Sequence, residues 1–303
     1  MTTKLLAAAT IAVAGMVSTL APAGSTDMNT ADSTRYLSRA DGRIAYDDVG
    51  SGPLVVMVPG LGDLRQEYRL LAPRLAAEGY RVVTMDLRGH GQSTTGWSDY
   101  TSSAIGSDIV ALVEQLNAGP ATVIGTSMGA AAAAWAAAEA PARIERLVLV
   151  GPFVRDIPPT SWLAGVSQAA IIQGALLRPW GPWAWGKVYA TFYGQLPSDF
   201  EAYRARLSAN LKEEGRMEAL QAMIAASKAD AEARLHEVKA PVLVVMGSAD
   251  PDFADPRKEA DTVAHLLRGT VSMVEGAGHY PHVEQPDTVI GAVVSFIRGG
   301  EQS

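Results

Sequence analysis

Short apolar runs along this chain alternate with longer segments in which apolar residues recur every three or four positions. Runs of about five apolar residues predict strands buried on both faces, and the longer period predicts helices that pack against them. The predicted strands cover residues 54–58, 81–85, 121–124, 146–150, 242–246 and 270–274. The predicted helices cover about 64–78, 102–116, 130–140, 257–267 and 286–298. Strands that alternate with helices predict an α/β fold with a doubly wound, mostly parallel sheet.

Turn signals predict where several of these elements end. Asp41-Gly42 predicts a hairpin between short strands at 35–37 and 43–48. Asp63 stands where a helix N-cap is expected, and Gly79 where a helix stop is expected. These two residues therefore predict the ends of the helix at 64–78.

The interval between residues 150 and 242 shows no strand pattern. Helix-like segments at about 199–211 and 216–226 occupy its second half. We therefore expect a helical cap inserted into the α/β core. The predicted cap covers residues 153–239, and the predicted core covers 34–152 and 240–299.

Aromatic residues are dense in the predicted cap and are accompanied by few charges. They are Trp162, Trp180, Trp183, Trp185, Tyr189, Phe192 and Tyr193. Because aromatic side chains bury large apolar areas, we expect most of them to pack the cap onto the core. Ligands bind at the carboxyl edge of open α/β sheets, so some of them should also line a mostly apolar pocket there.

The first residues have the pattern of a targeting segment. Lys4 precedes an apolar run at 5–17, and Ala21-Pro22-Ala23 resembles a cleavage site. The pattern predicts a signal peptide at 1–23, a polar linker at 24–33 and an exported protein. The alternative is a cytoplasmic protein with an N-terminal extension. The apolar run is shorter than the roughly 20 residues of a membrane span, so no stable membrane anchor is expected.

Composition excludes several classes of function. The formal net charge of −7 argues against nucleic acid or an anionic membrane surface as a partner, because both attract basic patches. The chain has no cysteine, which excludes disulfides, thiolate catalysis and cysteine-ligated metals. With 303 residues, 48% of them hydrophobic, the chain can bury a large core.

The sequence Gly125-Thr126-Ser127-Met128-Gly129 lies between a predicted strand and a predicted helix. A serine in this pattern is typical of a nucleophile elbow, a sharp turn that strains the serine backbone. Gly125 and Gly129 would prevent clashes in such a turn. The helix N-terminus could then stabilise a developing oxyanion. The alternative is a glycine-flanked loop with a helix-capping serine.

A serine nucleophile needs a base, and the base needs a carboxylate. Of the five histidines, His279 is favoured because it follows a glycine-rich loop after the last predicted strand. His282 is the rival base. Asp250 follows a predicted strand and is the candidate acid, with Asp252 and Asp255 as rivals that could simply form turns and helix caps. The order serine, acid, histidine is that of an α/β-hydrolase triad.

The oxyanion would need two backbone N–H donors. We predict that Met128, which follows the serine, supplies one, and that Leu61, in the loop after the strand at 54–58, supplies the other. A tight turn at residues 59–62 is compatible with this role. His90 is interpreted as a structural residue, because the expected triad is complete without it.

On these motifs the chain resembles the α/β-hydrolase superfamily over about residues 35–298. The motifs lie at 59–62, 86–93, 125–129, 247–250 and 278–286. The resemblance implies an α/β-hydrolase fold with a helical cap insertion, and a triad of Ser127, Asp250 and His279. The chain departs from the family in having Pro59 where a histidine usually precedes the glycine of the oxyanion loop.

A serine at the elbow, where some relatives have aspartate, implies acyl chemistry. We therefore predict a serine hydrolase that cleaves small to medium apolar esters through an acyl-enzyme, without a cofactor or metal. Alternatives within the family are lactonases, carbon–carbon bond hydrolases and perhydrolases. A non-catalytic small-molecule-binding protein is a further alternative. A dinucleotide-binding dehydrogenase is excluded, because Arg65 stands where the third glycine of its fingerprint would be. The oligomeric state does not follow from the sequence.

Overall fold

The computed structural model describes residues 34–156, 174, 176–177 and 179–299. The chain divides into two units, 1–30 and 31–303, and all described residues belong to the second. The predicted signal peptide at 1–23, the linker at 24–33 and Trp162 therefore lie outside the described residues. No helix among the described residues is long and apolar enough to cross a membrane.

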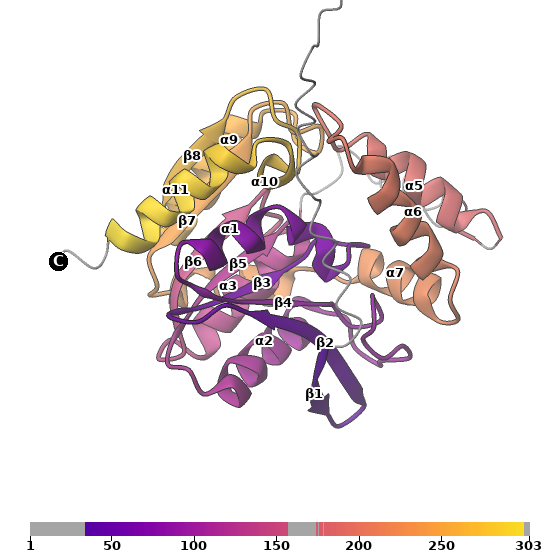
Figure 1. The fold of residues 1–303 in the computed structure, drawn as a ribbon, viewed down its shortest axis with the longest axis horizontal. Coiled ribbons are helices and arrows are strands. Elements are labelled where there is room, and N and C mark those ends of the chain that lie inside the picture. The colour runs from indigo at the N-terminus through magenta and orange to yellow at the C-terminus, as the bar shows by residue number, and fades with distance from the viewer. Residues whose placement is uncertain (1–33, 157–173, 175, 178, 300–303) are drawn as a thin grey trace, which may run out of the picture. The chain divides into compact units, whose positions relative to one another are not determined.

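An eight-stranded sheet forms the centre of the structure (Figure 1), in the order β1-β2-β4-β3-β5-β6-β7-β8. Its first two strands form the predicted antiparallel hairpin, and β2 also pairs antiparallel with β4. All other neighbours are parallel, as predicted. The strands are β1 (Arg35–Arg39), β2 (Gly42–Val49), β3 (Leu54–Val58), β4 (Arg81–Met85), β5 (Ala121–Thr126), β6 (Ile144–Val150), β7 (Val242–Gly247) and β8 (Thr270–Val274).

Helices cover both faces of the sheet. Alternate residues of β3 belong to two different hydrophobic clusters, with Val56 in one and Val55 in the other. The first cluster includes residues of α2 (Ser102–Leu116), α3 (Met128–Glu139) and α9 (Pro256–Leu267). The second includes residues of α1 (Leu71–Ala77) and α11 (Pro286–Gly299). The sheet is therefore doubly wound, with a hydrophobic core on each face.

The regular elements described between β6 and β7 are all helical. They are α5 (Gly181–Ala190), α6 (Phe200–Leu211), α7 (Arg216–Ala225), α8 (Ala229–Glu232) and the 3₁₀ turn η2 (Leu235–Glu237). We call α5, α6 and α7 the cap helices, and they lie together beside the sheet (Figure 1). A third hydrophobic cluster joins residues of the cap helices to Leu64 and Tyr280 of the core.

The expectation for the aromatic residues holds for four of the six that are described. Trp185 and Tyr189 are buried, and Phe192 and Tyr193 are half-buried against the third hydrophobic cluster. The other two are exceptions, because Trp180 is 51% exposed and Trp183 is 66% exposed. Spacing along α5 explains the difference: Trp185 and Tyr189 are four residues apart and share the inner face of the helix.

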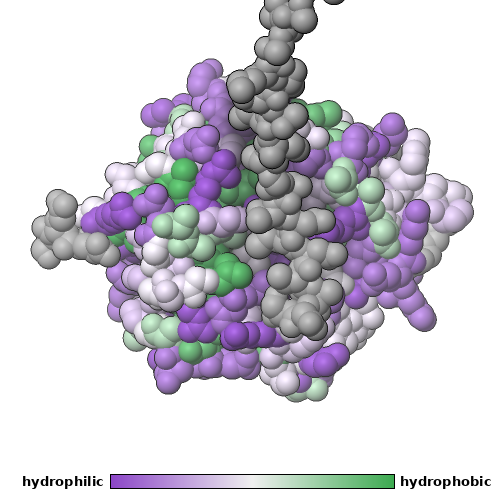
Figure 2. All heavy atoms as spheres, in the orientation of Figure 1, coloured by the Kyte–Doolittle hydropathy of each residue, from purple (hydrophilic) through white to green (hydrophobic). Residues whose placement is uncertain are grey.

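Hydrophilic side chains surround small hydrophobic patches on the face drawn in Figure 2. The visible, described part of this face therefore has no continuous apolar surface.

The helix predicted at 64–78 begins later than expected. A 3₁₀ turn, η1 (Arg65–Arg69), comes first, and α1 starts at Leu71. Pro73 accounts for this start, because proline has no N–H and is tolerated only in the first turn of a helix. Asp63 is not an N-cap: η1 follows Leu64 and has no side-chain cap, and the Asp63 carboxyl group is buried among tyrosines.

Candidate active site

Ser127 lies in the turn between β5 and α3. Its φ of 53° and ψ of −119° place a non-glycine residue in a strained backbone conformation. A Cβ on Gly125 would lie 2.5 Å from the Gly129 carbonyl oxygen, and a Cβ on Gly129 would lie 2.5 Å from the Pro59 carbonyl oxygen. The structure thus contains the strained turn predicted from the sequence, and both glycines are sterically required there.

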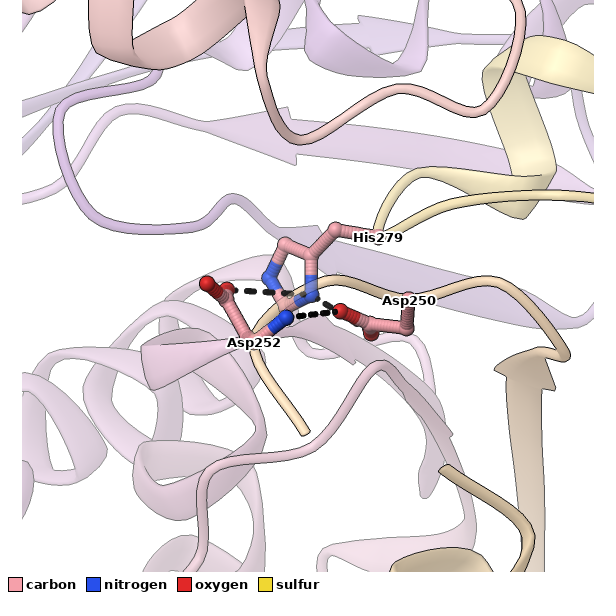
Figure 3. Close-up of side chains that lie close together, drawn as sticks. All are labelled: Asp250, Asp252 and His279. Carbon is pink, nitrogen blue, oxygen red and sulfur yellow. Dashed lines mark hydrogen bonds and ion pairs between the residues drawn. The ribbon is translucent and has the colours of Figure 1, made fainter. Parts of the chain in front are cut away.

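His279 and Asp250 are hydrogen-bonded to each other (Figure 3), with Nδ1 of the imidazole 2.8 Å from Oδ2 of the carboxylate. Both residues are buried. Asp250 follows β7, and His279 lies in the loop between β8 and α10 (Pro281–Glu284). The His279 backbone N–H donates to the Phe192 carbonyl oxygen at 2.7 Å, which fixes this loop against the chain that follows α5. Because Nδ1–H is directed at Asp250, Nε2 is the nitrogen that can accept a proton.

The charge of the imidazole is set by opposing effects. Burial lowers the pKa of His279, but the charge and hydrogen bond of Asp250 raise it, with a further contribution from Asp252. The net effect is a pKa above the ordinary value for histidine. A protonated His279 is therefore stabilised by two carboxylates, which is what a base that must carry a proton during a reaction requires.

The rival acids occupy different positions. Asp252 Oδ2 lies 3.5 Å from His279 Nδ1, and the Asp252 backbone N–H donates to Asp250 Oδ1 at 3.0 Å. Asp255 accepts the backbone N–H of Lys258 at 2.9 Å and caps α9. The structure thus pairs Asp250 most closely with His279, leaves Asp252 in contact with the pair, and uses Asp255 as a helix cap.

The other two histidines of interest are buried elsewhere. His282 Nε2 lies 2.9 Å from Glu67 Oε1, and burial lowers the pKa of His282 to about 3. His90 Nδ1 lies 2.9 Å from the Arg88 carbonyl oxygen, and burial lowers its pKa to about 4. Both are neutral core residues at neutral pH, and neither lines the pocket described next.

A pocket of about 360 Å³ brings the predicted site residues together. Its walls are mostly apolar and come from both the core and the cap helices. The lining residues are Leu61, Ser127, Met128, Phe153, Leu176, Ala184, Trp185, Val188, Phe192, Met223, Ile224, Lys228, Asp252, His279 and Tyr280. Asp250 does not line the pocket and contacts His279 through Nδ1.

The two predicted oxyanion donors both line this pocket. Met128 is the first residue of α3, where N–H groups have no partner within the helix. In the loop after β3, the Gly60 N–H donates to Glu67 Oε2 at 2.8 Å, and the Asp63 N–H donates to the Gly60 carbonyl oxygen at 3.2 Å. The Leu61 N–H itself donates to no acceptor among the described residues, so it is available for a ligand.

Three side chains of the site could also hold a cation. One ligand atom each from Asp250, Asp252 and His279 lies within 4.8 Å of the others. A cation bound to His279 Nδ1 would displace the proton that this nitrogen shares with Asp250, so the two arrangements exclude each other.

Comparison with known proteins agrees with this geometry. The family model for the alpha/beta hydrolase fold matches residues 53–286. The chain belongs to the α/β-hydrolase family. The fold class and the resemblance inferred from the sequence are both confirmed.

Individual members of the α/β-hydrolase family are similar along most of the chain. 3-Oxoadipate enol-lactonase 2 of Acinetobacter baylyi is 29% identical over 226 residues, which is 72% of this chain and 79% of the relative. A bromoperoxidase from Bacillus anthracis has a TM-score of 0.76 at 22% identity, covering 88% of this chain and 100% of that one. A thermophilic esterase from Thermogutta terrifontis has a TM-score of 0.73 at 24% identity, covering 88% and 98%.

Several residues of this hydrolase site were not found by sequence reasoning. Phe153 and Tyr280 line the pocket, and Lys228 adds a positive charge to it. Tyr280 directly follows the predicted base, so its position in the sequence was the one signal available. Asp63 was predicted to be a helix N-cap, and its actual partners lie more than 120 residues away in the sequence.

Proposed function

We propose that this α/β hydrolase is a serine hydrolase that cleaves carboxylic esters of small to medium apolar substrates through an acyl-enzyme. One observation carries the proposal. The hydrogen-bonded pair of His279 and Asp250 and the strained Ser127 meet at one mostly apolar pocket. This is the arrangement that activates a serine for attack on a carbonyl carbon.

The proposed reaction has two stages. The Ser127 hydroxyl oxygen attacks the ester carbonyl carbon while its proton passes to His279 Nε2. The carbonyl oxygen becomes an oxyanion held by the Leu61 and Met128 N–H groups. Collapse of this intermediate breaks the bond to the alcohol, which takes the proton from His279. A water molecule then attacks the acyl-enzyme by the same route and releases the acid and free Ser127.

The pocket walls support an apolar acyl or alcohol group. Trp185 and Val188 from α5 and Met223 and Ile224 from α7 supply apolar surface beside Ser127. Ligand sites of this type bind by burying apolar area, with few polar groups for orientation. At about 360 Å³ the pocket is finite, which favours short to medium chains.

The named relatives widen the range of esters worth testing. A lactone is an ester within a ring, so the same residues could open the ring of a small lactone. The similarity to an enol-lactonase supports including lactones. The similarity to a bromoperoxidase supports including peroxide as an alternative to water in the second stage.

The decisive experiment replaces the nucleophile. Ser127→Ala should lose ester hydrolysis by several orders of magnitude and lose labelling by a fluorophosphonate, while its thermal unfolding stays close to that of the wild type. Ser38→Ala is the matched control, because Ser38 is exposed on β1. A wild-type protein that binds apolar ligands without labelling or turnover would instead support a non-catalytic binding protein. Retention of more than a few per cent of wild-type kcat by Ser127→Ala would rule out Ser127 as the nucleophile.

A further inference from the structure

Asp63 is a fully buried carboxyl group that the proposed reaction does not use. Three tyrosine hydroxyls donate to it. Tyr189 and Tyr203 donate to Oδ1 at 2.7 and 3.0 Å, and Tyr280 donates to Oδ2 at 2.7 Å. Burial raises the pKa of Asp63 to about 8, helped by the charge of Glu67, while the tyrosine hydroxyls oppose the shift. Burying a carboxyl group is costly, and the three donors offset part of this cost.

The three tyrosines come from three separate elements. Tyr189 lies on α5 and Tyr203 on α6, so Oδ1 holds two cap helices. Tyr280 directly follows His279, so Oδ2 holds the loop of the proposed base. The Tyr193 hydroxyl extends this network by donating to the Tyr189 hydroxyl at 3.1 Å. One side chain therefore connects the roof of the pocket to the loop of the base.

Asp63 also lies in the loop that carries a proposed oxyanion donor. It is two residues after Leu61, and its N–H closes the turn onto Gly60. On the other side of Leu61, the Gly60 N–H is held by Glu67. Gly62, between Leu61 and Asp63, has a φ of +74°, and a Cβ there would lie 2.5 Å from the Trp185 ring. The loop is thus fixed on both sides of Leu61 and covered by α5.

We propose that Asp63 is a positioning residue: its carboxyl group holds the cap helices and the His279 loop against the Leu61 loop, and so sets the geometry between oxyanion donor, base and pocket roof. The predicted effect of Asp63 on turnover rests on the proposed function. The connection that Asp63 makes between the cap helices, the His279 loop and the Leu61 loop is a property of the fold and is measurable without a substrate.

Substitutions can test separately the hydrogen bonds of Asp63 to the cap helices and its hydrogen bond to the His279 loop. Asp63→Asn keeps one acceptor oxygen and replaces the other with an NH₂ group, which cannot accept a hydrogen bond from a tyrosine hydroxyl. Tyr280→Phe removes the hydrogen bond between Asp63 and the loop of the proposed base. Tyr203→Phe removes one of the two hydrogen bonds between Asp63 and the cap helices. Tyr46→Phe is the matched control, because Tyr46 is also buried and its hydroxyl is bonded to Gln115 on a distant part of the core.

The test combines hydrogen–deuterium exchange with steady-state kinetics on p-nitrophenyl acetate and hexanoate. In Asp63→Asn and Tyr280→Phe we expect faster exchange at residues 60–64 and 278–282. We also expect kcat to fall by about ten- to a hundredfold, with the KM for acetate changed less than twofold, because a displaced donor or base acts in the transition state. Tyr203→Phe should mainly raise the KM for hexanoate. Tyr46→Phe should change none of these quantities.

Each alternative outcome is decisive. If Asp63→Asn lowers the unfolding temperature but leaves exchange at 60–64 and both kinetic constants at wild-type values, Asp63 is only structural and the inference is wrong. If Asp63→Asn does not fold, Tyr280→Phe and Tyr203→Phe decide by the same criteria. If the wild type hydrolyses no ester, the proposed function fails, and the exchange data alone decide whether Asp63 couples the loops.

Discussion

At the scale of single residues, the site depends on a few side chains in positions that ordinary residues rarely occupy. Ser127 has a positive φ, which costs energy for a residue with a Cβ. Asp250 and His279 are both buried, yet the hydrogen bond between them offsets the cost of burying a carboxylate and an imidazole. The surrounding core must keep these residues in place, because none of these arrangements is favourable in isolation.

Replacing the acid distinguishes Asp250 from its neighbours. Asp250→Asn should reduce kcat by about 10⁴-fold, because an amide cannot stabilise the imidazolium and favours the wrong tautomer. Asp255→Asn is the matched control: asparagine caps helices as well as aspartate does, so α9 and the activity should be unchanged. The measurement is kcat on a p-nitrophenyl ester, with unfolding followed by circular dichroism. Inactive Asp255→Asn beside active Asp250→Asn would contradict the assignment of the acid.

Asp252 should control the pH dependence of the reaction. Its carboxylate raises the pKa of His279, and a base must be unprotonated to act. The acidic limb of kcat/KM therefore follows the pKa of His279. Asp252→Asn removes one charge that favours the protonated form, so this limb should move to lower pH while the enzyme remains active. The measurement is a profile of kcat/KM from pH 5 to 9. An unchanged limb, or a shift to higher pH, would show that Asp252 does not act on His279 through its charge.

At the scale of elements, close approach between helices accounts for the small residues of α2 and α3. The helix α3 is mostly alanine, and its contacts with α2 are extensive. A Cβ on Gly106 of α2 would lie 2.5 Å from the Trp135 ring and 3.0 Å from the Ala132 carbonyl oxygen. The absence of a side chain at Gly106 therefore lets α2 and α3 pack this closely.

Replacing two helical glycines by alanine compares the cost of overpacking with the gain in helix propensity. Gly106→Ala should destabilise the protein by about 1–3 kcal/mol, because overpacking outweighs the better propensity of alanine. Gly291→Ala on α11 should stabilise it by about 0.5–1 kcal/mol, because a Cβ there meets nothing within 4 Å. Urea unfolding gives both values. If both variants were stabilised, the close contact between α2 and α3 would not limit this position.

At the scale of the whole described unit, the pocket exists only because the core and the cap helices meet. The core supplies Ser127 and His279, and α5 and α7 supply much of the apolar wall. These parts are far apart in the sequence and are held together by the third hydrophobic cluster and by Asp63. Substrate preference is therefore a property of the assembled unit.

The acyl-length profile measures this property. Each buried methylene contributes about 0.8 kcal/mol, so kcat/KM should rise about three- to fourfold per methylene until the pocket is full. The optimum should lie among short to medium chains. Trp185→Ala removes apolar wall and should reduce the rise, while Trp183→Phe, on the exposed face of α5, is the control. The measurement is a p-nitrophenyl series from acetate to palmitate below micelle formation. A flat profile, or a preference for charged acyl groups, would contradict an apolar pocket but not the roles of Ser127 and His279.

Much of the fold could be predicted from the sequence, because local patterns of apolar and polar residues indicate the strands and helices. The continuous apolar run of β3 and the period of α2 reflect burial on both faces and on one face, respectively. The serine between Gly125 and Gly129 could be interpreted as a strained turn, because small neighbours are a local steric requirement. Pro73 also indicated that α1 starts late, but Asp63 was interpreted as the helix cap instead.

Only the tertiary structure could decide which polar residues meet. The sequence favoured Asp250 but left Asp252 and Asp255 as rivals. The structure separates the three, because Asp250 and Asp252 lie 2.8 and 3.5 Å from His279 Nδ1 and Asp255 caps α9. Asp63 looked like a helix cap, yet its partners come from residues 126, 140 and 217 positions away. The periodicity of side chains reports which face of an element is buried, because burial is a property of one segment. A hydrogen bond between distant side chains depends on the packing of several segments at once, so no local pattern in the sequence specifies it.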